Sequence, residues 1–176
     1  MTIVPESKNW TWVLERQCPD CRFDAVHFDR QRGPAEVRSI IARWETVLAR
    51  PDARVRAKPT MWSPLEYGCH VRDVFRIFDG RLERMLNEHE PRYANWDQDV
   101  TAIEDHYDAQ DPKVVAGELR VAGELLAERM ATVSGPAWER KGLRSDGATF
   151  TVDSFLRYLL HDPIHHLWDV GDCTRS

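Results

Sequence analysis

Three of the chain's seven histidines lie within six residues of one another, in the stretch "LLHDPIHHLWDV" at 159–170. His161 and His165 are four residues apart, so on a helix their side chains would point the same way, with β-carbons about 5–6 Å apart. Two imidazoles so placed can hold one metal ion, as the histidine pair on a metalloprotease helix does, although Asp162 stands where such proteases carry a Glu. On spacing alone, the alternative is that these histidines lie by chance on a helix surface and bind no metal.

The surroundings of the pair favour a metal site. The flanking residues are apolar, and a buried imidazole without a partner costs about 1–3 kcal/mol. Pro163 lies between the two histidines, although proline inside a helix removes a backbone hydrogen bond. His70 belongs to a second expected helix, and helical bundles build metal sites from side chains on facing helices. We therefore expect His70, His161 and His165 to be the three protein ligands of a catalytic metal ion.

Three further residues are candidates for a supporting role. Asp162 and Asp169 stand near the pair, and either carboxylate can accept the proton of an imidazole's outer nitrogen and so fix its tautomer. His166 lies about 100° around the helix from His165, which places it away from an ion held by the other two. We expect His166 either to support a metal ligand without binding the ion itself or to have a purely structural role. For the two acids, a solvated helix face is the alternative.

The cysteines indicate a metal site less strongly than the histidines do. "CPDC" at 18–21 has the two-residue spacing of a zinc knuckle or a redox pair. No second pair of this kind exists, which excludes a site with four cysteine ligands, although His27 is near enough in sequence to join Cys18 and Cys21. No disulfide framework is expected for the four cysteines, which include Cys69, expected in the core, and Cys173.

Four long amphipathic segments account for most of the chain. One is "GPAEVRSIIARWETVLAR" at 33–50, with apolar residues at helical spacing. The next begins at Pro64, where Ser63 and Glu66 form a capping box, and runs for more than twenty residues. A third begins after Asp111 and ends near Val133, and the last covers 151–168. The polar stretch at 137–150 is expected to be a loop or a small hairpin, so the sequence predicts an all-α four-helix bundle.

Length and composition indicate one domain. The 176 residues fit a single core, with an irregular N-terminal arm at 1–33, anchored by Trp10, Trp12 and Phe23, and the bundle at 34–176. The net charge of −5 includes no basic block, so nucleic acid is an unexpected partner. No stretch reaches the roughly 20 apolar residues of a membrane helix, and no signal peptide is evident, so a cytoplasmic location is expected.

"EYGCHVRDV" at 66–74 together with "HDPIHHLWDV" at 161–170 resembles the pattern of the DinB superfamily, which includes bacillithiol transferases and mycothiol-dependent maleylpyruvate isomerases. The resemblance spans roughly residues 35–170. It implies a bundle in up-down-down-up order and a divalent ion, zinc or nickel, held by His70, His161 and His165. In the isomerase branch one ligand on the last helix is a Glu where this chain has His161, so that particular activity is not implied.

The resemblance also implies a chemistry, in which the metal activates a low-molecular-weight thiol of the mycothiol or bacillithiol class for transfer to an electrophilic small molecule. A thiol on a metal with three neutral ligands becomes a thiolate near neutral pH. A bound water would be activated at the same position, so a metal-dependent hydrolase is the alternative. A module whose ion is purely structural is a third reading, and pairing into a homodimer is a further expectation.

Overall fold

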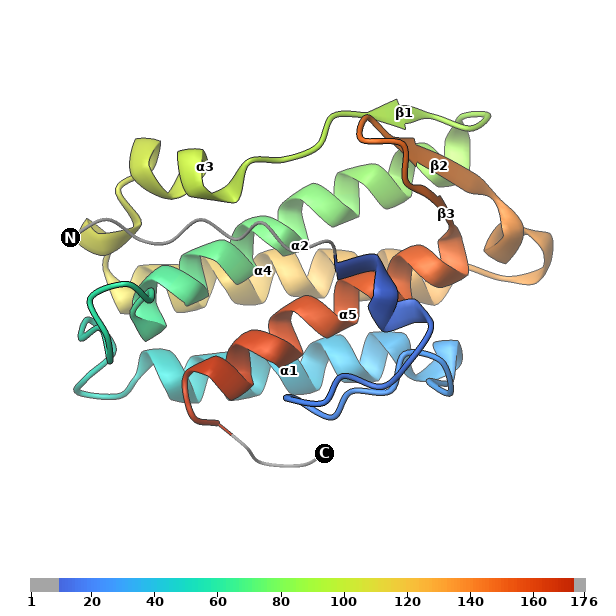
Figure 1. Ribbon diagram of the computed structural model, residues 1–176. Coiled ribbons are helices and arrows are strands. Elements are labelled where there is room, and N and C mark those ends of the chain that lie inside the picture. The colour runs from blue at the N-terminus through green and yellow to red at the C-terminus, as the bar shows by residue number, and fades with distance from the viewer. Residues whose placement is uncertain (1–9, 173–176) are drawn as a thin grey trace.

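The computed structural model describes residues 10–172, and its core is a bundle of four long helices (Figure 1). These are α1 (Gly33–Leu48), α2 (Pro64–Asn87), α4 (Pro112–Thr132) and α5 (Val152–Asp169). Figure 1 shows α1 and α5 running in one direction and α2 and α4 in the other. The expected all-α bundle in up-down-down-up order is confirmed.

The helices begin where local chemistry allows their first backbone N–H groups to be satisfied. At the start of α2, the Ser63 hydroxyl accepts from the N–H of Glu66 while the Glu66 carboxylate accepts from the N–H of Ser63, at 3.3 and 2.8 Å. This capping box confirms the start predicted from the sequence. Asp111 caps α4 through the N–H groups of the next turn, and Thr151 caps α5.

Short elements close one end of the bundle. Strands β2 (Lys141–Arg144) and β3 (Thr149–Thr151) pair antiparallel, and β1 (Arg92–Tyr93) pairs parallel with β2. The predicted loop or hairpin at 137–150 therefore contains a hairpin. A short helix α3 (Gln98–Glu104) lies in the connection between α2 and α4, and 3-10 turns cover Tyr107–Ala109 and Gly135–Glu139.

The N-terminal arm lies against α5. It contains 3-10 turns at Trp10–Leu14 and Arg30–Arg32. The Arg157 guanidinium of α5 donates to the carbonyl oxygens of Ala25 and Val26 at 2.8 and 3.0 Å. Val13 and Cys18 of the arm are buried, so this segment adds to the core.

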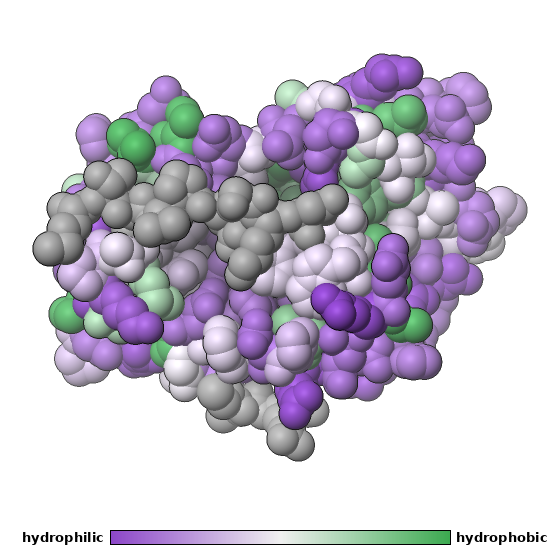
Figure 2. Space-filling view, viewed as in Figure 1, coloured by the Kyte–Doolittle hydropathy of each residue, from purple (hydrophilic) through white to green (hydrophobic). Residues whose placement is uncertain are grey.

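The surface is mixed in character. Figure 2 shows one face as mainly hydrophilic, with hydrophobic residues in small, separated groups. None of the helices in the described part of the chain is long and apolar enough to cross a membrane.

Candidate metal centres

Helix α5 carries two pairs of potential ligands, offset by one residue. His161 and His165 form the first pair, and Asp162 and His166 form the second. Both pairs have the i, i+4 spacing that places side chains on one face, but successive residues are turned by about 100°. The two pairs consequently face different neighbours.

The second pair meets α2. The Nε2 atom of His70 lies 3.1 Å from Oδ1 of Asp162, and the Nε2 atom of His166 lies 3.8 Å from the same oxygen. One ligand atom from each of these three residues lies within 4.8 Å of the others. Around a tetrahedral zinc ion, nitrogen and oxygen ligands are separated by about 3.3 Å, so the spacings are close to what one ion needs. We refer to His70, Asp162 and His166 as the α2–α5 group.

The protonation of the α2–α5 group suits a cation. Nδ1 of His166 lies 2.8 Å from Oδ2 of Asp169, and in the tautomer that donates Nδ1–H to this carboxylate the lone pair of Nε2 is directed into the group. Burial alone would raise the pKa of Asp162, but its interactions with His70 and His166 outweigh that effect and hold the pKa well below 3.8. An imidazole lone pair and a carboxylate oxygen thus lie 3.8 Å apart, both able to accept a cation.

Aromatic side chains enclose one side of this group. Trp96 stacks on the His70 ring at 5.3 Å between centroids, and Trp62 contacts the same ring at 5.5 Å. Tyr67 packs against His166 at 4.7 Å. His70 is fully buried, whereas the Asp162 side chain remains 33% exposed. The group is therefore held rigidly on the α2 side and reachable from solvent on the Asp162 side.

The first pair meets the N-terminal arm instead. His161 and His165 lie with Cys18 and Cys21, and one ligand atom from each of the four lies within 4.8 Å of the others. Sγ of Cys18 is 3.6 Å from Nδ1 of His165. We refer to these four residues as the arm–α5 group.

Burial determines the charge state of the arm–α5 group. It lowers the pKa of His161 to about 4, with a smaller contribution from His165, and it also lowers the pKa of His165. Both imidazoles are consequently neutral at pH 7, the form in which histidine binds metals. Burial and the neighbouring Cys18 raise the pKa of Cys21 to about 12, although the backbone N–H of Phe23 acts in the opposite direction.

The structure does not bring His70, His161 and His165, the three residues expected to share an ion, into one group. α5 presents the edge formed by residues 162 and 166 to α2, so His70 meets Asp162 and His166. The 100° rotation between neighbouring residues turns His161 and His165 toward the arm. Asp162 and His166, expected in supporting roles, lie with His70 in a group that could hold a metal ion, and Asp169 contacts the imidazole of His166.

The arm–α5 group combines two signals that were each visible in the sequence. Cys-x2-Cys followed by His-x3-His is the ligand order of many structural zinc sites, although the two halves here are separated by 139 residues, from 22 to 160. His27, the nearest histidine in sequence to the cysteines, does not join them. It is exposed and pairs with Asp24 at 2.9 Å. Cys69 is buried in the core as expected, and Cys173 lies outside the described residues.

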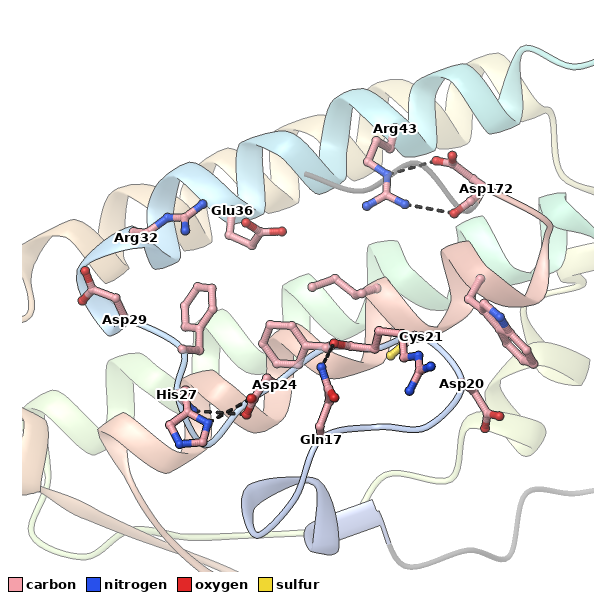
Figure 3. Close-up of a pocket in the computed structure, with 15 residues that line it drawn as sticks. Gln17, Asp20, Cys21, Asp24, His27, Asp29, Arg32, Glu36, Arg43 and Asp172 are labelled. Atoms are coloured by element: carbon pink, nitrogen blue, oxygen red, sulfur yellow. Dashed lines mark hydrogen bonds and ion pairs between the residues drawn. The ribbon is translucent and has the colours of Figure 1, made fainter.

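A pocket of about 920 Å³ lies between the arm, α1 and α5 (Figure 3). Most of its lining is polar or charged, and Figure 3 shows Cys21 on its wall beneath Arg43 and Asp172, which are paired at 3.0 Å. None of the three residues of the α2–α5 group lines this pocket. The pocket therefore belongs to the arm side of α5.

Comparison with known proteins agrees with this architecture. Residues 37–170 match the family model of the DinB superfamily, so the chain belongs to that superfamily. A similar solved structure is YfiT from Bacillus subtilis, described as "a probable metal-dependent hydrolase with an unusual four-helix bundle topology". It has a TM-score of 0.63 and 15% identity, and the match covers 95% of this chain and 89% of that one. No curated protein is similar enough to count as a match.

Proposed function

We propose that the protein is a metal-dependent enzyme whose metal centre is formed by His70, Asp162 and His166. The observation that carries this proposal is the convergence of two Nε2 atoms on Oδ1 of Asp162, at 3.1 and 3.8 Å. A catalytic zinc ion commonly has three protein ligands and one open position, and this group offers three. The partly exposed Asp162 side chain supports access to that position from solvent.

Each residue of the centre has a separate task. Asp162 is ionised at neutral pH and offsets part of the charge of a divalent cation. Asp169 holds the proton of His166 on Nδ1, which keeps Nε2 available as a ligand. His70 contacts the rings of both Trp62 and Trp96, which restrict the imidazole that contributes its nitrogen from α2. A divalent ion held there would supply the positive charge that favours ionisation of a small thiol or of water.

We propose thiol transfer as the leading reaction, with a low-molecular-weight thiol of the mycothiol or bacillithiol class as donor and an electrophilic small molecule as acceptor. Membership of the DinB superfamily supports this assignment, because thiol-using enzymes belong to it. The mixed donor set adds support, since the isomerase branch also uses one carboxylate from the last helix. In this chain Asp162 supplies that carboxylate.

Hydrolysis is the second candidate. Two histidines and one carboxylate also form the zinc site of several peptidases. The description of YfiT as a probable metal-dependent hydrolase agrees with this alternative.

The test is a panel of thiols with a chromogenic electrophile, run beside a panel of activated esters, on protein loaded with zinc or nickel. We expect turnover with one panel that falls at least 100-fold in Asp162→Asn and in His166→Gln. His89→Gln is the control, because His89 is an exposed histidine outside both groups. Metal content measured on the same samples should fall in the two site variants and stay unchanged in the control.

Two outcomes would count against the enzyme. Turnover that survives in both site variants would place the reaction elsewhere. A metal that is retained in the α2–α5 group without turnover on either panel would favour a non-catalytic module.

A further inference from the structure

The geometry points to a second metal site, in which Cys18, Cys21, His161 and His165 bind one zinc ion that fastens the N-terminal arm to α5. Thiolate sulfur together with imidazole nitrogen is the donor set that selects zinc, and four protein ligands define a closed, structural site. This proposal does not depend on the activity of the α2–α5 group.

The distances fit a tetrahedral ion. With Zn–S near 2.3 Å and Zn–N near 2.0–2.1 Å, a sulfur and a nitrogen on the same ion are separated by about 3.5 Å. Sγ of Cys18 and Nδ1 of His165 are 3.6 Å apart. The four ligand atoms lie within 4.8 Å of one another, so a small contraction brings all of them to one ion.

A buried atom in the group lacks a partner. Nε2 of His161 is inaccessible to solvent and has no hydrogen-bond partner among the described residues. His161 is only 3% exposed, so bulk solvent does not supply the missing partner. Leaving such an atom unpaired costs about 1–3 kcal/mol, whereas coordination would satisfy an imidazole nitrogen at this position.

The arm has the local structure to present both sulfurs. The N–H of Cys18 donates to the carbonyl of Phe23 at 3.0 Å, and the N–H of Arg22 donates to the carbonyl of Cys18 at 3.1 Å. Arg22 adopts a left-handed conformation with φ of 65°, which turns the chain back after the second cysteine. These bonds close a tight loop, and the two sulfur atoms lie within 4.8 Å of each other.

Charge and environment favour a closed site. Two thiolates balance the double charge of zinc while the two imidazoles are neutral, so the loaded site adds no net charge to a buried region. The Trp10 ring packs against the rings of His161 and His165, with 5.3 and 4.9 Å between ring centroids. The Phe23 ring lies next to His161, with 6.4 Å between centroids. These rings cover the two histidines, and Cys21 lies at the edge of the group, on the wall of the pocket.

The two cysteines lie outside residues 37–170, the part that matches the superfamily. The histidine pair lies inside it, so the site joins a shared helix to a segment that precedes the matched region. An ion there would link residues 140 or more positions apart and restrict the arm in the way a cross-link does.

The test uses the full chain loaded with cobalt(II) in place of zinc, because cobalt bound to thiolate gives an intense sulfur-to-metal charge-transfer absorption in the near ultraviolet. We expect this absorption in the wild type, in Asp162→Asn and in Cys69→Ala, which removes a buried thiol outside the group. It should be lost in Cys18→Ser and in Cys21→Ser, and each of these should bind one zinc ion fewer per chain than the wild type.

X-ray absorption at the zinc edge of the wild type keeps the test independent of whether the cysteine variants fold. A sulfur shell near 2.3 Å together with a nitrogen shell supports the site. Zinc with no sulfur neighbours, or a Cys18–Cys21 disulfide in protein kept under reducing conditions, would overturn it. Because Asp162 is a proposed ligand of the α2–α5 group and not of the zinc site, a failure of the proposed enzyme and a failure of the zinc site give different results.

Discussion

His161 and Asp162 are neighbours in the sequence, yet their side chains belong to different groups because one residue of helix turns through about 100°. The same offset separates His165 from His166. Helix α5 therefore presents one ligand pair to the arm and another to α2 within six residues.

The pairing of His166 with Asp169 leads to a prediction. Asp169→Asn should weaken metal binding by the α2–α5 group about 10–100-fold, because the acceptor that keeps the His166 proton on Nδ1 becomes an amide. Metal titration monitored by calorimetry would measure the change. Asp24→Asn is the matched control, since Asp24 also pairs with a histidine three residues away, at 2.9 Å, but outside either group. Equal affinity in Asp169→Asn and wild type would show that the pair does not tune the ligand.

The sequence alone identified the residue types of the site better than their partners. Spacing marked His161 and His165 as a pair, and the expected place of His70 on a facing helix added the third residue, as the resemblance also implied. The sequence could not show which edge of α5 faces α2. Rotating the helix by one residue leaves the pattern of apolar positions almost unchanged. The arm has no periodicity, so its contact with α5 could not be derived from pattern at all.

Among the elements, α4 packs closely against α1 and α2 because of a glycine. A β-carbon added to Gly123 would lie 2.6 Å from Cδ1 of Ile41 and 3.0 Å from Cε2 of Phe75. Both neighbours are buried in the core, so neither can move without disturbing other packing.

Two alanine substitutions in α4 should therefore have opposite effects. Gly123→Ala should lower the free energy of unfolding by about 1–3 kcal/mol through overpacking. Gly117→Ala, where an added β-carbon would meet nothing within 4 Å, should raise it by about 0.5–1 kcal/mol. Denaturant unfolding of both variants would measure the difference. A stabilised Gly123→Ala would show that the interface between α1, α2 and α4 has spare room.

A buried ionic network connects α2 with the segment before α4. The Asp73 carboxylate accepts from both Nε and Nη2 of Arg72 at 2.9 Å and from the Tyr107 hydroxyl at 2.5 Å. Burial opposes ionisation of Asp73, but these bonds outweigh it and hold its pKa below 3.8. A depressed folded pKa means that the stabilisation is complete well above 3.8 and is lost as the pH falls through the folded pKa.

Asp73→Asn should accordingly lower the free energy of unfolding by about 3 kcal/mol at pH 7, because Arg72 and Tyr107 lose a charged acceptor. The difference in the free energy of unfolding between the variant and the wild type should become smaller as the pH falls below 3.8. Unfolding by urea at pH 7 and pH 3 would test both statements. Asp52→Asn serves as control, since Asp52 pairs with Arg50 at an exposed position. A gap that is independent of pH would mean that the charge of Asp73 is unimportant.

The helices themselves were predictable in detail. Ser63, Pro64 and Glu66 marked the start of α2, and Asp111 and Pro112 marked the start of α4, because capping depends on residues close in sequence. The pairing of β1 with β2 was not predictable, since it joins residues about 50 positions apart in strands of two and four residues.

At the scale of the whole molecule, we propose that α5 contributes to two separate metal centres, one with α2 and one with the arm. The four-helix bundle sets the position of the first, and the arm completes the second. The set predicted from the sequence, His70, His161 and His165, would share a single ion. The number and position of the bound ions therefore distinguish that one-ion prediction from the proposal of two centres.

The most direct test is a crystal structure of zinc-loaded protein with anomalous diffraction measured on both sides of the zinc edge. We expect two anomalous peaks per chain, one among His70, Asp162 and His166 and one among Cys18, Cys21, His161 and His165. A single peak coordinated jointly by His70, His161 and His165 would contradict the proposal of two centres.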